Sequence, residues 1–163
     1  MPRIQSFPPI ANPHAKILLL GSMPGAESLR AAQYYAHPRN AFWPIMGELF
    51  GAGLDREYQI RLEILKSHGI ALWDVLASCV RVGSLDSAIE HDAANDFPAF
   101  FQVHPHISRV YFNGAMAEKS FHKHVRGLPN PQALQFQRLP STSPAHAALR
   151  YKQKLEAWRV VAE

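Results

Sequence analysis

The sequence predicts an α/β fold, a three-layer α/β/α sandwich with a four-stranded parallel sheet in the middle. Two observations lead to this fold class. Short apolar segments alternate along the chain with longer amphipathic ones, which is the order of strands and helices in a parallel sheet covered on both faces. The first apolar segment, residues 15–20 (AKILLL), is almost uninterrupted, as expected for a strand buried on both sides.

Four segments are predicted as strands because each is short, mainly apolar and separated from the next by a helical pattern. They are residues 15–20, 69–76 (GIALWDVL), 109–112 (RVYF) and, more weakly, 135–139. Helices are predicted at 41–50, 55–68, 97–103, 115–125 and from 143 to about 161. Asn95 or Asp96 is expected to cap the helix at 97–103. Ser143 followed by Pro144 is typical of a helix start, so the last helix is placed there.

The length and the single cysteine limit the remaining organisation. A chain of 163 residues with no repeat and no linker is predicted to be one domain, 1–163, with residues 1–14 as an extended, proline-stiffened arm. The longest apolar run is short and the N-terminus lacks a signal-peptide core, so we expect no membrane segment. Cys79 lies among apolar residues, which favours burial and a protein of the reducing cytoplasm.

The net charge and the histidine spacing do not identify a ligand. The formal net charge of +4 permits a polyanionic partner such as DNA without establishing one. His104 and His106, like His122 and His124, are two residues apart, a spacing that does not put two rings on one helix face. No cluster of cysteine or carboxylate completes a ligand set. We therefore expect no metal and no cofactor.

Ligands of parallel sheets bind at the carboxyl ends of the strands, so the loops after Leu20, Leu76, Phe112 and Leu139 are the candidates for a site. The first loop is the turn Gly21-Ser22-Met23-Pro24-Gly25. Its glycines allow close approach of a ligand to the backbone, although a tight strand–helix connection with no ligand has the same composition.

Residues 34–43 (YYAHPRNAFW) place aromatic, imidazole, guanidinium and amide groups within ten residues. Phe42 and Trp43 are expected in the core. Tyr35, Arg39 and Asn40 are harder to explain as packing, because aromatic rings beside a basic group suit a flipped base and its phosphates. Asn40 also stands where a helix N-cap is expected, so capping is the alternative role for its amide.

The stretch from Gly25 to Trp43 resembles the first motif of the mismatch-specific uracil/thymine glycosylases of the uracil-DNA glycosylase superfamily. The resemblance lies in the glycine–proline turn and, at matching spacing, the Ala-His-Pro and Asn-x-Phe-Trp sequences. The loop 139–144 (LPSTSP) resembles the superfamily's serine-rich second motif, and 112–117 (FNGxxA) its base-reading strand end. The resemblance covers most of the chain and implies a uracil-DNA glycosylase-like fold.

The motifs GSMPG, QYYAHPRNAFW, LWDVLASCVRVGSLDSAI, FNG and LPSTSP together are similar to those of the hypoxanthine-DNA (deoxyinosine) glycosylases, and departures from the better-known branches agree with this. Met23 stands at the position that holds a water-activating Asp or Asn in the better-known branches. The single cysteine excludes the branches that bind an iron–sulfur cluster, because such a cluster needs four cysteine ligands. In the hypoxanthine branch the catalytic amide aligns with Asn40, and a second asparagine, aligning with Asn113, belongs to the base pocket. An amide oxygen orients water but is not a strong base, so the enzyme is expected to depend on leaving-group assistance and on pocket electrostatics.

The resemblance implies roles for the remaining residues of these loops. Tyr35 is expected to stack on the flipped base, and the Asn113 amide to pair with O6 and N1–H of hypoxanthine. Asp74 is expected to orient a loop or to serve as a structural cap, and His37 to stabilise its own loop. The further base-binding candidates are Gly21, Ser22 and Met23. The DNA-binding candidates are Pro24, Gly25, Arg39, Ser141, Thr142 and Ser143.

The function that follows is a monofunctional DNA glycosylase acting as a monomer on double-stranded DNA. It would flip a deaminated base, hypoxanthine, out of the duplex and hydrolyse its N-glycosidic bond in base excision repair. Three alternatives stay open: a uracil or thymine mismatch glycosylase, a non-catalytic damaged-DNA-binding module, and a nucleoside hydrolase that acts on free inosine. Met23 argues against the first, and the presence of both Asn40 and Asn113 argues against the second.

Overall fold

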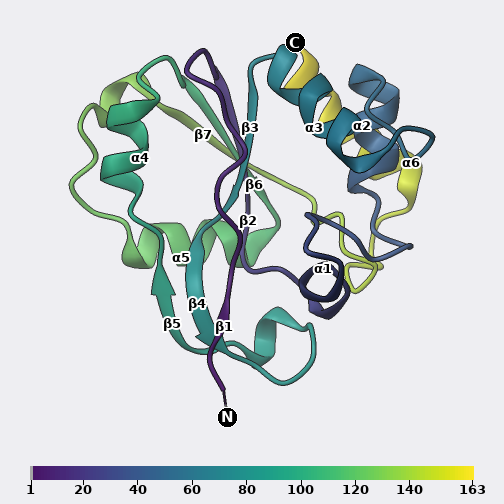
Figure 1. The fold of residues 1–163 in the computed structure, drawn as a ribbon, viewed down its shortest axis with the longest axis horizontal. Coiled ribbons are helices and arrows are strands. Elements are labelled where there is room, and N and C mark those ends of the chain that lie inside the picture. Colours follow the sequence, from purple (N-terminus) through teal and green to yellow (C-terminus); the bar gives the residue numbers. More distant parts are fainter. Residues whose placement is uncertain (1) are drawn as a thin grey trace.

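A four-stranded parallel sheet forms the centre of the molecule in this computed structural model, which describes residues 2–163. Its strands lie in the order β3-β2-β6-β7 (Figure 1). They are β2 (Ile17–Gly21), β3 (Ile70–Asp74), β6 (Arg109–Asn113) and β7 (Gln135–Leu139). All four predicted strands are present, and the predicted α/β fold class with a four-stranded parallel sheet is confirmed.

Helices cover both faces of this sheet (Figure 1). On one face lie α4 (Phe97–Val103) and α5 (Ala115–His124), and on the other α2 (Phe42–Phe50), α3 (Tyr58–Ser67) and α6 (Tyr151–Trp158). The short α1 (Ala26–Ala31) follows the glycine turn. Asp96, one of the two cap candidates, caps α4: its Oδ1 accepts the Ala99 N–H at 3.1 Å.

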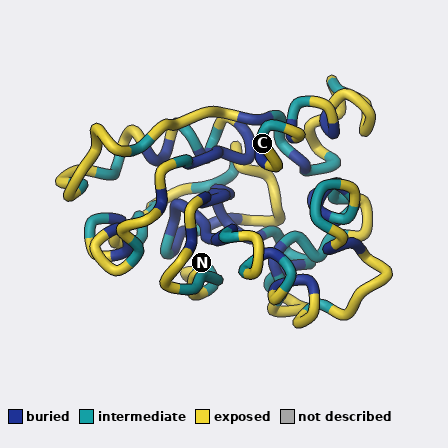
Figure 2. The backbone as a smooth tube through the Cα atoms, turned by 90° about the horizontal axis from the view of Figure 1, so that it is seen from above, coloured by how far each residue is buried: buried dark blue, intermediate teal, exposed yellow. Residues whose placement is uncertain are grey.

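The continuous apolar run of β2 follows from its position between two cores. Leu18 and Leu20 pack into one cluster with Phe97 of α4, whereas Ile17 and Leu19 pack into the other with Phe42. Because successive side chains of a strand point to opposite faces, a strand covered on both sides needs apolar residues at every position. Figure 2 shows the buried backbone concentrated in this central layer.

A second, three-stranded antiparallel sheet was not predicted. It consists of β1 (Ile4–Gln5), β4 (Leu76–Val80) and β5 (Glu90–Ala94), in the order β1-β4-β5. The single strand expected at 69–76 is therefore wrong at its end. The backbone leaves the parallel sheet after Asp74, where the N–H of Val75 donates to the Gly21 carbonyl, and the next strand pairs with the N-terminal arm instead.

The last predicted helix is wrong at its start. α6 begins at Tyr151, and a 3₁₀ turn (Arg159–Ala162) follows it. The Ser143 hydroxyl accepts the Ala145 N–H at 3.2 Å, so the Ser-Pro pair forms a local turn rather than a helix start. No helix among residues 2–163 is long and apolar enough to cross a membrane.

The strand order brings the functional loops together. The chain passes from β2 to β3 on one side and then returns to β6 on the other side of β2. This reversal leaves a crevice at the carboxyl ends, where open α/β sheets bind ligands. Gly21 pairs in register with Asp74, and Asn113 with Leu139, so all four strands end at the same edge.

Candidate active site

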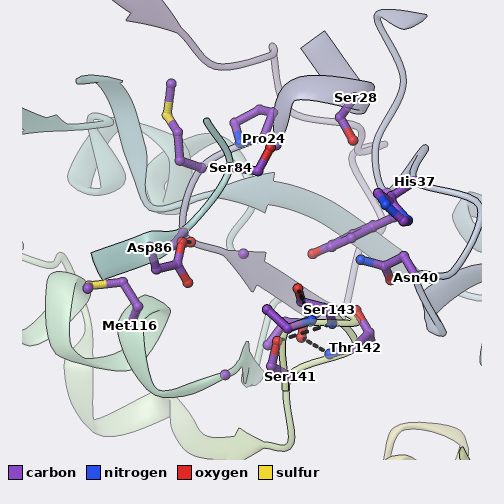
Figure 3. A pocket seen from close by; sticks show the side chains of 18 of the residues that line it. Pro24, Ser28, His37, Asn40, Ser84, Asp86, Met116, Ser141, Thr142 and Ser143 are labelled. Atoms are coloured by element: carbon purple, nitrogen blue, oxygen red, sulfur yellow. Dashed lines mark hydrogen bonds between the residues drawn. The ribbon is translucent and has the colours of Figure 1, made fainter. Parts of the chain in front are cut away.

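A cavity of about 820 Å³ lies at this edge of the parallel sheet. Its volume is in the usual range for small-molecule and cofactor sites. Every residue singled out from the sequence lines it, which brings loops far apart in the chain into one site (Figure 3). These residues are Gly21, Ser22, Met23, Pro24, Gly25, Tyr35, His37, Arg39, Asn40, Asp74, Asn113, Ser141, Thr142 and Ser143.

The glycine turn allows two polar side chains to approach the end of β2. A Cβ at Gly21 would lie 2.6 Å from Asp74 Oδ1 and 3.0 Å from the Tyr35 hydroxyl, so any side chain there would clash. Ser22 and Met23 follow, and both are buried. Met23 packs into the core beside Phe97, so the turn presents an apolar side chain to the cavity at this position.

Tyr35 and Asp74 form a buried polar corner of the cavity. Tyr35 has a left-handed backbone conformation (φ 56°) and stacks on Phe42, with ring centroids 4.0 Å apart. Neither the Tyr35 hydroxyl nor Asp74 Oδ2 has a hydrogen-bond partner within residues 2–163. Since an unpaired buried polar atom costs about 1–3 kcal/mol, two of them beside one cavity favour a polar ligand there.

Burial also changes the acidity of this corner. It raises the pKa of Asp74 to about 7, with a further contribution from the charge of Asp86 that Arg81 opposes. Burial, followed by the charge of Asp74, raises the pKa of Tyr35, which stays protonated and is a hydrogen-bond donor. The Asp74 carbonyl accepts the Asn95 amide at 2.8 Å, so this loop is held by the Asp74 backbone.

Asn113 ties the end of β6 to the serine-rich loop. Its Nδ2 donates to Thr142 Oγ1, and its Oδ1 accepts the Thr142 N–H, both at 2.9 Å. One amide hydrogen and one lone pair remain for a ligand. Thr142 is 1% exposed and its carbonyl accepts the Ala41 N–H. Thr142 is therefore turned inwards and holds the loop to β6, and its expected contact with DNA stays a prediction.

The two serines of this loop lie nearer the surface. Ser141 Oγ accepts the Ser143 N–H at 3.2 Å, and both side chains are partly exposed. The loop is held from behind by α6, where Trp158 Nε1 donates to the Pro140 carbonyl and Lys154 Nζ to the Ser143 carbonyl. A firm attachment of this kind leaves both serine side chains on a rigid rim.

The segment 34–43 contributes the wall next to this loop, to which the Ala41 N–H is bonded. Asn40 Oδ1 accepts the Phe42 N–H at 2.9 Å, so the amide does help to start α2. A carbonyl oxygen has a second lone pair, which leaves one acceptor site for water. His37 Nδ1 accepts the Arg39 N–H at 3.0 Å, which stabilises its own loop, and Arg39 lies exposed at the rim.

Sequence reasoning missed one further element of the site, the loop 81–89 between β4 and β5. Ser84, Asp86 and Met116 of α5 also line the cavity. The sequence around Asp86 (GSLDS) belongs to the segment that resembles the hypoxanthine branch, but no spacing indicated that it reaches the glycine turn. Within the part of the chain that the structure describes, no group of three His, Cys, Asp or Glu residues could hold a metal ion.

Comparisons with known proteins agree with this geometry. Residues 8–162 match the family model described as the uracil DNA glycosylase superfamily. A hypoxanthine DNA glycosylase of Methanosarcina barkeri is 42% identical over 111 residues, which are 68% of this chain and 70% of that protein. A hypoxanthine DNA glycosylase of Methanosarcina acetivorans is 35% identical over 158 residues, 96% of each chain.

A solved structure is similar over nearly the whole length. It is a solution NMR structure from Methanosarcina acetivorans, described as a candidate uracil DNA glycosylase. The two chains superpose with a TM-score of 0.80 at 32% identity, and the match covers 99% of each.

Proposed function

The chain belongs to the uracil DNA glycosylase superfamily, and from that membership we propose that it is a DNA glycosylase that removes hypoxanthine from double-stranded DNA. The observation that carries the proposal is the cavity at the strand ends, in which the Tyr35 hydroxyl, the Asp74 carboxyl and the Asn113 amide surround one space. The relatives named hypoxanthine DNA glycosylase support the choice of base.

The free hydrogen-bonding groups of the cavity fit the edge of hypoxanthine, which presents O6 as an acceptor and N1–H as a donor. The remaining amide hydrogen of Asn113 and the Tyr35 hydroxyl are donors, and the Asp74 carboxyl supplies an acceptor. Adenine presents the opposite pattern and would leave buried groups unpaired. In this arrangement Asn113 reads the base together with Tyr35 and Asp74, rather than alone as the sequence implied.

In the proposed mechanism the C1′–N9 bond breaks through an oxocarbenium-like transition state. Asn40 orients the attacking water through its free lone pair, because Met23 has no group that can do so. Tyr35 acts on the flipped base through its hydroxyl rather than by the expected stacking, because one face of its ring already lies on Phe42 and a base bonded at its edge to the hydroxyl does not also lie on the ring. Backbone N–H groups of the turn 21–25 contribute electrostatic stabilisation in a closed pocket. Monomeric action and a reducing compartment remain part of the same proposal.

Incubation with duplexes that hold a single inosine, uracil or xanthine tests the function directly. We expect abasic sites in the inosine duplex at a rate above those for uracil and xanthine. Preferential excision of uracil or of mismatched thymine would favour the mismatch glycosylase. Binding without excision would favour a damage-binding module, and release of hypoxanthine from free inosine would favour a nucleoside hydrolase.

Binding to duplex DNA is expected to fall roughly tenfold or more between about 50 and 200 mM salt, because contacts to phosphates release counterions. The proposed contacts are the rim groups Arg39, Ser141 and Ser143 and the backbone N–H of Gly25. Pro24 has no N–H and its carbonyl accepts from Arg81, so it is expected to contact DNA through its ring alone. Arg39→Ala should weaken binding to all sequences and lower the salt slope by about 1. An affinity that stays constant over this salt range would contradict a duplex substrate.

Asn113→Ala is expected to reduce excision of inosine more than binding to undamaged duplex, because it removes a group that reads the base. Thr142→Val is the matched control. It removes the Oγ acceptor of Asn113 Nδ2 and loosens the loop, but it leaves the amide in the cavity. Single-turnover rates and duplex affinities of both variants give the comparison. Equal losses in the two variants would mean that Asn113 acts only through the loop.

A further inference from the structure

The loop 81–89 is fastened to the glycine turn at three points. The Arg81 guanidinium donates to the Pro24 carbonyl, and Ser84 Oγ accepts the Ala26 N–H at 2.7 Å. The Ser22 hydroxyl donates to Asp86 Oδ1 at 2.6 Å. A surface loop held in this way has a defined position relative to the turn, so its side chains can take part in a site.

Asp86 places a carboxylate beside the apolar position of that turn. Its partner Ser22 directly precedes Met23, and Figure 3 shows the Asp86 carboxyl group on the cavity wall across from Asn40. The hydrogen bond uses one lone pair of Oδ1, which leaves Oδ2 for another contact. The residue as a whole is exposed and lines the cavity, while its carboxyl group is partly buried where it meets Ser22.

An acidic side chain in this place opposes the binding of DNA. The protein carries a net charge of +4, and its cavity must accept a polyanion. A carboxylate at its mouth repels phosphates and weakens binding. The nearby Arg81 donates to two backbone carbonyls, and its Nη1 has no hydrogen-bond partner among the described residues. Burial raises the pKa of Asp86 and the charge of Arg81 opposes that rise, so Arg81 offsets part of the carboxylate charge without forming an ion pair within 4.0 Å. The unfavourable charge therefore calls for a function that needs it.

We propose that Asp86 is a catalytic carboxylate of this glycosylase, whose negative charge stabilises the positive charge that develops on the deoxyribose of the flipped nucleotide. The inference rests on the proposed function. When the C1′–N9 bond breaks, its electron pair leaves with N9 and the sugar becomes cationic. The oxygen of one water then bonds to C1′ and its proton passes through solvent to the departing base. Asp86 and Asn40 act from opposite walls, on the sugar and on the water respectively.

The other acidic groups of the cavity are less suited to this role. Asp74 lies at the buried corner beside Gly21, where a base rather than a sugar would fit, and burial raises its pKa to about 7. Burial also raises the pKa of Asp86, but the hydrogen bond from Ser22 and the charge of Arg81 oppose that rise. Glu27 of α1 forms an ion pair with Arg30. Asp86 is the acidic group that combines accessibility with a fixed position.

Asp86→Asn tests the proposal because asparagine keeps the acceptor for Ser22 and removes only the charge. At about pH 8 we expect the single-turnover rate on inosine duplex to fall about 10²-fold, in line with the loss of one electrostatic contact. Duplex affinity should rise or stay unchanged, and the midpoint of thermal unfolding should stay near that of the wild type. Glu90→Gln is the matched control, since it removes an equal charge from an exposed residue outside the cavity.

A second comparison examines the link to Ser22. Ser22→Ala removes the hydroxyl that holds the carboxylate and should lower the rate by less than Asp86→Asn does. The double variant should be no slower than Asp86→Asn alone, because both changes act on one group. If the rate losses of the two single variants multiply in the double variant, Ser22 does not act through Asp86.

The activity of the wild type distinguishes an error about Asp86 from an error about the proposed function. If the wild type excises inosine and Asp86→Asn does so within a few-fold, Asp86 is only a loop anchor and the inference is wrong. The same conclusion holds if Glu90→Gln lowers the rate as much as Asp86→Asn. If the wild type leaves inosine and uracil duplexes intact, the proposed function itself is wrong.

Discussion

Replacing Asn40 by alanine is expected to lower the single-turnover rate of inosine excision by about 10²-fold or more, with little change in duplex affinity. The Asn40 amide lines the cavity with a free acceptor lone pair, whereas the neighbouring Arg39 is a donor only. Loss of a group that positions the attacking water has effects of this size in other hydrolytic sites. Rapid-quench measurement with enzyme in excess gives the rate.

The structural role of Asn40 has to be separated from this effect, because its Oδ1 also accepts the Phe42 N–H at the start of α2. Ala41 is the N-cap residue and Asn40 precedes it, so this bond is a side-chain turn before the helix, and its loss costs about 1 kcal/mol of stability. Asn40→Ser provides the control, since a serine hydroxyl forms the same kind of turn but is shorter and presents a different acceptor to the cavity. We expect the serine variant to regain the stability that alanine loses while its rate stays low.

Three outcomes distinguish a catalytic role of Asn40 from a structural one. If Asn40→Ala excises inosine within a few-fold of the wild type, Asn40 has only a structural role and another group positions the water. If the serine variant regains both stability and rate, the slow rate of the alanine variant came from a displaced helix start. A low rate in a stable serine variant supports a direct role for the amide.

The sheet and most of the site could be predicted from the sequence because both depend on local signals. A strand buried on both faces must be apolar throughout, and the loops that follow such strands must meet at one edge. Glycine at position 21 is needed because Asp74 and Tyr35 approach within contact distance of any Cβ there. The strand ends therefore indicated which loops meet, and the family resemblance singled out the residues within them.

The missed features depend on contacts between distant segments. β5 has the sequence EHDAA, which is polar and has no strand periodicity; it forms because β4 offers it a pairing edge. The docking of Asp86 on Ser22 joins residues 64 positions apart. Thr142, which we expected among the DNA-binding residues, is likewise buried because it pairs with Asn113, 29 positions away. A local sequence pattern does not indicate which distant residues will contact each other, so these contacts could not be predicted from the sequence.

Asp74→Asn is expected to increase the stability of the protein at about pH 8 and to change it little at about pH 4. Burial raises the pKa of Asp74 from its ordinary value of 3.8 to about 7. Between these two values the folded protein keeps a proton that the unfolded chain has lost. Stability therefore falls as the pH rises through this range, and above about pH 7 the full penalty for a buried charge is present.

The size of the gain follows from the shift. Three pKa units correspond to roughly 4 kcal/mol at 1.36 kcal/mol per unit, which is an upper estimate because an unpaired amide replaces the carboxyl group. Chemical denaturation at the two pH values measures it. Asp96→Asn is the control: Asp96 is exposed and caps α4, and asparagine caps as well, so the substitution should show no such pH-dependent gain.

A carboxyl group that destabilises the fold at neutral pH calls for a reason in function. Asp74 Oδ2 is buried, unpartnered among the described residues and beside the Tyr35 hydroxyl, where a flipped base would supply the missing partner. The stabilised Asp74→Asn variant should therefore excise inosine more slowly than the wild type, the common trade between stability and activity at a binding site. A stability difference equal at both pH values would mean that Asp74 ionises normally in the folded protein. If Asp74→Asn excises inosine at the wild-type rate, Asp74 does not take part in recognition of the base.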